Sequence, residues 1–136
     1  MIDFYVEGRP APQGSKKGYS RQGSTRVQLV EMSRHVKPWR DAVKAAAAEQ
    51  AEQHGMLDGA LALGVTFYLP RGKTVTRLLP TTAPDLSKLI RSTEDALVDA
   101  RLVRDDALFV LYENPCKRYA AGAPGARIRI RKLPHV

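Results

Sequence analysis

The chain has 136 residues, a length that suits one domain, and its 43% hydrophobic and 26% charged residues are typical of a globular protein. Its single cysteine, Cys116, excludes an intramolecular disulfide framework and fits an intracellular, reducing compartment. The 22 Lys and Arg residues outnumber the 14 Asp and Glu residues, giving a net charge of +8. This charge indicates a polyanionic partner, with nucleic acid ahead of an anionic membrane, although it could simply keep the protein soluble.

The first half of the chain predicts two strands, a loop and a helix. Ile2–Glu7 alternates apolar and polar residues, which is typical of a strand with one buried face. The Gly-, Pro- and Ser-rich segment Gly8–Ser24 predicts a loop, and Arg26–Glu31 alternates again as a short strand. Lys37–Gln53 is expected to be a helix, with Pro38 in its first turn, where a missing N–H is harmless.

The second half continues with a strand, a loop, a helix and two further strands. Ala60–Leu69 predicts an apolar central strand and Pro70–Pro84 a polar loop. Apolar residues recur at helical spacing through Pro84–Ala100, which predicts the second helix. Strands are expected at Ala107–Tyr112 and Ala126–Lys132. The expected fold is a single α+β domain over residues 1–136, with a mixed β-sheet and two main helices packed on it. No segment approaches the roughly 20 apolar residues of a membrane span, and residues 1–8 do not read as a signal peptide.

Basic residues gather in the segments predicted as loops. The first two loops contain no acidic residue, and a third loop is expected between the last two strands. Loop cations of this kind can contact DNA phosphates. The predicted DNA-binding residues are Lys16, Lys17, Arg21, Arg71, Lys73, Arg77, Lys117 and Arg118.

Carboxylates flank the second predicted helix. Asp85 lies at its start, and Asp105 and Asp106 lie between the helix and the next strand. Mg²⁺ prefers carboxylate oxygens, and a bound metal ion can drive phosphodiester hydrolysis with help from a nearby cation such as Lys88 or Arg91. The two acidic positions can meet only if the chain folds back along the helix. The alternative is structural, with Asp85 as a helix N-cap, the Asp pair in a turn, and the cations on a solvated surface.

The same segment resembles the signature of the RusA family of Holliday junction resolvases. In that family an Asp-Leu-Asp-Asn-Leu helix start is followed by a Lys, an Asp-Ala-Leu and an Asp-Asp pair. The spacing is kept without a gap in this chain, at Asp85-Leu86-Ser87-Lys88-Leu89, Arg91, Asp95-Ala96-Leu97 and Asp105-Asp106. The loop Gly8–Lys16 is also similar to the loop after the first strand in phage members of the family.

The resemblance implies a homodimer that binds four-way DNA junctions, with no membrane association. It implies symmetrical cleavage with Mg²⁺, or Mn²⁺ in its place, held by three aspartates, in DNA recombination and repair. The expected location is the cytoplasm of a bacterial or phage-infected cell.

Carried over by position, Asp85 and Asp106 match two of the three metal-binding aspartates and the third falls on Ser87. Asp105 is the candidate to replace the missing carboxylate in part, with the Ser87 hydroxyl as a further candidate ligand. Arg91 takes the place of the essential lysine, and Lys88 that of the asparagine, so both join the expected catalytic set. A second hypothesis is a branched-DNA binding protein with weak or no cleavage, because serine is a poor metal ligand.

Overall fold

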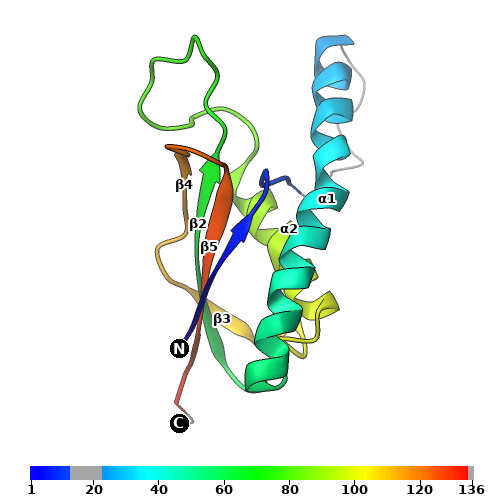
Figure 1. The fold of residues 1–136 in the computed structure, drawn as a ribbon, viewed down its shortest axis with the longest axis vertical. Coiled ribbons are helices and arrows are strands. Elements are labelled where there is room, and N and C mark those ends of the chain that lie inside the picture. The colour runs from blue at the N-terminus through cyan, green and yellow to red at the C-terminus, as the bar shows by residue number, and fades with distance from the viewer. Residues whose placement is uncertain (13–22, 135–136) are drawn as a thin grey trace.

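The computed structural model describes residues 1–12 and 23–134, and within residues 23–33 it describes the backbone only. A five-stranded mixed β-sheet forms one layer, and two helices, α1 (Gly23–His54) and α2 (Leu86–Asp99), form a second layer against it (Figure 1). The chain therefore folds as a small α+β domain, as the sequence predicts. Neither described helix has the length and apolar character that a membrane crossing requires.

The sheet is built around β2 (Leu61–Leu69). On one side β2 pairs antiparallel with β5 (Gly125–Lys132), which in turn pairs antiparallel with β1 (Ile2–Glu7). On its other side β2 pairs parallel with β3 (Phe109–Tyr112) along its first residues and with β4 (Cys116–Tyr119) along its last. The strands predicted for β1, β2 and β5 are confirmed to within one residue at each end.

Alternation along β1 and β5 gives the sheet one apolar and one charged face. The helices cover the apolar face, to which the two strands contribute six buried side chains, those of Ile2, Phe4, Val6, Ala126, Ile128 and Ile130. On the other face Arg127 donates hydrogen bonds of 3.0 and 2.6 Å to the carboxylate of Asp3. The domain thus has one hydrophobic core, between the sheet and the helices.

Two predictions for α1 are wrong. Residues 26–31 belong to this helix and form no strand, and Pro38 lies inside the helix rather than in its first turn. Val27 and Val30 fit helical spacing as well as Val27 and Leu29 fit strand alternation, so a six-residue window does not separate the two. The predicted loop is correct for residues 8–12, but residues 23–24 begin α1, and residues 13–22 lie outside the described residues.

The apolar stripe predicted along α2 is confirmed. The side chains that α2 buries in the core are those of Leu89, Ile90, Thr93 and Leu97. Leu86, the first residue of the helix, is partly buried, and Ala100, just beyond its end, is buried. Trp39 of α1 is also buried, and its indole Nε1 donates to the Thr93 hydroxyl at 3.3 Å. This bond ties the two helices together inside the core.

The structure differs from the sequence prediction after α2. The strand predicted at residues 107–112 is split into a short 3₁₀ helix, η1 (Asp106–Leu108), and β3. The loop predicted between the last two strands is correct for residues 113–115 and 120–124 but wrong for Lys117 and Arg118, which lie in β4. The four residues of β4 show no apolar alternation, so the strand depends on the backbone edge that β2 offers rather than on a local pattern.

Candidate functional site

Asp85 occupies the N-cap position of α2. Its backbone is extended (φ −69°, ψ 139°), but its side chain makes no capping hydrogen bond. The carboxylate is exposed and lies 3.6 Å from the ammonium of Lys88, one turn along. The N-cap alternative is therefore correct for the position of Asp85 but not for its side chain, whose oxygens are open to a ligand.

The other predicted residues of this helix line its exposed side. Ser87, Lys88 and Arg91 are all exposed within the first two turns. Lys88, three residues after Asp85, therefore brings a cation close to its carboxylate, whereas Arg91 lies nearly two turns along the helix, where its charge acts on Glu94. Ser87 supplies a hydroxyl, not a carboxylate, at the position where the resemblance implies a third acidic group.

Asp105 and Asp106 follow the end of α2. Asp105 caps η1 by accepting a 3.0 Å hydrogen bond from the backbone N–H of Ala107, and this bond lowers the pKa of Asp105. The hydrogen bond with Asp105, desolvation, and the negative charges of Asp105 and Asp95 raise the pKa of Asp106. The structural role in a turn therefore explains Asp105. It does not explain Asp106, whose carboxylate is repelled by those of Asp105 and Asp95.

Glu94 is an acidic residue that the sequence analysis missed. It is buried on the core side of α2, and its Oε2 accepts a 2.7 Å hydrogen bond from the hydroxyl of Tyr112 in β3. Burial raises the pKa of Glu94 despite this bond, and the charges of Asp106 and Asp95 raise it further. Desolvation and the bond to Glu94 raise the pKa of Tyr112 to about 12. The available signal was an acidic residue four positions after Ile90, within the apolar stripe.

The predicted acidic residues do not converge within one chain. Asp106 lies near Glu94 and Asp95, in the second half of α2, whereas Asp85 lies before the first residue of this helix. Asp95 is ten positions after Asp85, which is about 15 Å along the helix axis. In the described part of the chain, no group of three or more His, Cys, Asp or Glu side chains could hold a metal ion.

The basic loops meet at the Asp85 end of α2. Lys117 reaches from β4 to donate to the carbonyls of Thr82 and Pro84, at 2.8 and 2.9 Å, and so holds the residues just before Asp85. Arg71 donates at 3.2 Å to the carbonyls of Val75 and Arg77, which fixes the shape of this loop. Lys117 and Arg71 thus have structural contacts, whereas Lys73 and Arg118 are exposed. The predicted DNA-binding residues Lys16, Lys17 and Arg21 lie outside the described residues.

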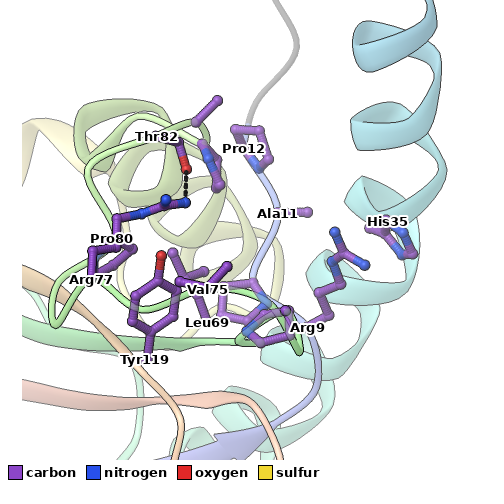
Figure 2. A pocket seen from close by; sticks show the side chains of 15 residues that line it. Arg9, Ala11, Pro12, His35, Leu69, Val75, Arg77, Pro80, Thr82 and Tyr119 are labelled. Atoms are coloured by element: carbon purple, nitrogen blue, oxygen red, sulfur yellow. Dashed lines mark hydrogen bonds between the residues drawn. The ribbon is translucent and has the colours of Figure 1, made fainter.

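The two loops also share a cavity of about 190 Å³ (Figure 2). Arg9 enters it from the loop after β1, and Arg77 enters it from the loop after β2. Pro84, which follows a cis peptide bond, lines the same cavity and directly precedes Asp85. Positive charge from separate parts of the sequence is therefore placed beside one of the predicted metal ligands.

Comparison with known proteins identifies the family. The family model described as "Endodeoxyribonuclease RusA" matches residues 7–131, nearly the whole chain. The chain belongs to the RusA family. It is also 25% identical over 144 residues to the uncharacterized protein YqaN of Bacillus subtilis (strain 168), covering 97% of this chain and 96% of that protein.

Membership in the RusA family relates the acidic and basic residues to one activity, that of a nuclease. The matched region runs from the last residue of β1 into β5, so it includes Asp85, Asp106 and both basic loops. RusA proteins are nucleases that act on branched DNA, and RusA resolvases generally depend on a divalent metal. The exposed oxygens of Asp85 fit a hard divalent cation, and a cation beside Asp106 would relieve the repulsion by Asp105 and Asp95 that helps to raise the pKa of Asp106.

Proposed function

We propose that this protein is a Mg²⁺-dependent endonuclease that cuts four-way DNA junctions as a homodimer. The observation that carries the proposal is the RusA-family segment itself, which has exposed Asp85 at one end of α2, Asp106 near the other, and basic loops beside Asp85. Carboxylates would hold the metal ion, and the surrounding cations would hold the DNA phosphates.

A second copy of the chain would unite the two acidic positions. Because about 15 Å of helix separates Asp85 from the Asp95 turn, a metal site that uses both Asp85 and Asp106 is incomplete in one chain. A two-fold axis would set the α2 of the partner in the opposite direction. It would then place Asp85 near Asp106 of the partner subunit, and it would generate two equivalent sites for two junction strands.

The edge strand β3 offers a surface for this dimer. Three large apolar residues are exposed on it, with exposed fractions of 64% for Val110, 44% for Leu111 and 46% for Tyr112. β3 is also the last strand of the sheet on its side of β2, and an uncovered apolar edge favours pairing with another chain. Antiparallel pairing of two β3 edges satisfies the two-fold symmetry, and Asp106 lies three residues before this strand.

Each side chain of the site has a distinct role in this proposal. Asp85 and Asp106 would hold the metal ion, which lowers the pKa of bound water and withdraws charge from the phosphate. Lys88 and Arg91 would stabilise negative charge on the phosphate oxygens. Ser87 leaves the site one carboxylate short of the family pattern, so Asp105 and the Ser87 hydroxyl are its candidate supplements.

A nicking assay on a synthetic four-way junction tests the function. We expect cleavage with Mg²⁺ or Mn²⁺ and none with EDTA. Asp85→Asn and Asp106→Asn should abolish cleavage and preserve junction binding, because each removes a metal ligand but also removes negative charge near DNA. Asp41→Asn is the matched control, since Asp41 is exposed on α1 and pairs only with Lys37 in the described structure. Tight junction binding without cleavage in any metal would support the binding-protein hypothesis, and cleavage by either site variant at the parental rate would reject the site.

A further inference from the structure

The cavity between the two basic loops has the dimensions of a site for a small group. Figure 2 shows Arg77, Pro80, Thr82 and Tyr119 on one side of it and Arg9, Ala11 and His35 on the other. Its volume of about 190 Å³ lies below the roughly 300–1,000 Å³ of sites for drug-sized ligands. It suits a single nucleotide that is only partly enclosed, and it is too small for a longer segment of DNA.

The charges around the cavity favour an anionic group. Among the described residues that line it, none is acidic and two are the arginines Arg9 and Arg77. Arg77 is held in place by a 3.4 Å hydrogen bond from its Nη2 to the Thr82 hydroxyl. Arg9 has no hydrogen bond or ion pair within the described structure, so its guanidinium is available for a phosphate.

The rest of the lining favours a flat, apolar group. Tyr119 presents an aromatic ring, and the guanidinium of Arg71 lies 5.5 Å from the centre of that ring and steadies it. Pro10 and Pro80 add rigid, buried apolar surface. An aromatic ring such as that of Tyr119 can hold an unstacked base, because every base has a π-face that stacks on it. A phosphate-binding arginine and a base-binding wall in one small cavity match the two parts of a nucleotide.

We propose that this cavity holds one unstacked nucleotide of the DNA strand that enters the site, with its phosphate on Arg9 and its base against Tyr119 and the prolines. The proposal rests on the proposed action on branched DNA. The position supports it, because Pro84 lines the cavity and the next residue is Asp85. A nucleotide held there fixes the neighbouring phosphodiester bond close to the carboxylate. Taking a base out of the stack costs a few kcal/mol, and this cost is lowest for a base that is already unpaired.

The first experiment tests the cavity without DNA. The protein is titrated with each of the four deoxynucleoside monophosphates, and separately with inorganic phosphate, while NMR follows the backbone amides of Ala11, His35 and Thr82. We expect nucleotide binding on the order of 1 mM, as suits a ligand of so few atoms, and weaker binding of phosphate. Arg9→Ala should weaken nucleotide binding about tenfold, through loss of a charged hydrogen bond. Lys44→Ala, which removes an equal charge from the exposed side of α1, should leave it unchanged.

The second experiment tests the source of the nucleotide. A four-way junction carries 2-aminopurine at successive positions from the branch point, and its fluorescence is followed on protein binding in EDTA, where no cleavage occurs. We expect increased fluorescence at one position near the branch. Tyr119→Leu should lose most of this increase, whereas Tyr119→Phe keeps the ring and should keep the signal.

The outcomes separate this proposal from the proposed function. Junction binding without a fluorescence increase at any position overturns the nucleotide site and leaves the endonuclease proposal standing. Nucleotide binding in the first experiment without that increase also overturns it, since the cavity would then take free nucleotides only. A fluorescence increase that depends on Arg9 and Tyr119 supports the site even if no metal produces cleavage. An absence of amide shifts at about 20 mM nucleotide, far above the expected affinity, overturns it whatever the junction does.

Discussion

Mixing two inactive variants tests whether each metal site is shared between two subunits. A dimer of Asp85→Asn chains lacks Asp85 at both sites, and a dimer of Asp106→Asn chains lacks Asp106 at both. In a mixed dimer, one site carries both substitutions, and the other combines the intact Asp85 of one subunit with the intact Asp106 of the other. Random exchange of equal amounts makes about half of the dimers mixed, each with one intact site of two, so the mixture should nick junctions at about one quarter of the parental rate.

The assay uses a junction labelled on each strand, so that single nicks are distinguished from paired cuts. Mixed dimers should nick one strand without completing symmetrical resolution. Subunit exchange is verified independently with chains of two different tag lengths. The matched control mixes Asp85→Asn with the Asp85→Asn/Asp106→Asn double variant, which yields no intact site in any dimer and should stay inactive. If the first mixture remains inactive although exchange is complete, each site lies within one chain, and the reasoning from the length of α2 is wrong.

Three further predictions concern single substitutions. Ser87→Asp should lower the metal concentration required for half-maximal nicking, while the added charge at the amino end of α2 stabilises the fold by about 0.3–1 kcal/mol; parallel metal titrations of both proteins measure this. Gly125→Ala should lower the free energy of unfolding by about 1–3 kcal/mol, because an added Cβ meets β1 backbone and ring atoms, whereas Gly122→Ala meets nothing within 4 Å and should leave the denaturation midpoint unchanged. Lys117→Met should lower the single-turnover nicking rate about tenfold at an unchanged melting temperature, because the exposed loop before Asp85 loses two charge-assisted hydrogen bonds; an unchanged rate would show that these bonds do not position the site.

The parts of the fold that local pattern determines could be predicted from the sequence. Apolar residues recur at helical spacing over four turns of α2, and apolar and polar residues alternate strictly along β1 and β5. Each pattern therefore indicates both the type of element and the face that it buries. The first half of α1 carries an ambiguous pattern, because Val27, Leu29 and Val30 satisfy both periods. β4 carries no pattern, since backbone pairing with β2 decides it, and such pairing depends on residues about 50 positions away.

The candidate site divides in the same way. Asp85 and Asp106 could be predicted as site residues because they match the spacing of the RusA signature. Their local sequence alone fits a helix N-cap and a turn equally well. The cavity could not be predicted, because Arg9, His35 and Tyr119 come from a loop, a helix and a strand that only tertiary packing brings together. The distance between Asp85 and Asp106 could not be predicted either, because it depends on how far the chain runs back along α2 after residue 100.

That distance links metal binding to assembly. If the dimer brings Asp85 toward the carboxylates around Asp106 of the partner subunit, like charges oppose association until a cation neutralises them. A metal ion that binds only the assembled site then stabilises the dimer by about 2.7 kcal/mol per site when its concentration is 100 times its dissociation constant, which is about a hundredfold in the dimer equilibrium for each site and about ten-thousandfold for the two sites together. We therefore expect Mg²⁺ to lower the dissociation constant of the dimer in sedimentation experiments, and EDTA to raise it. Asp85→Asn should tighten the metal-free dimer, because it removes one of the repelling charges, and should abolish the effect of Mg²⁺, because it removes a ligand. Asp41→Asn removes the same charge from α1 and should do neither. A metal effect of equal size in Asp85→Asn and in the parent would mean that the ion acts elsewhere, and that the two ends of α2 do not meet across the dimer.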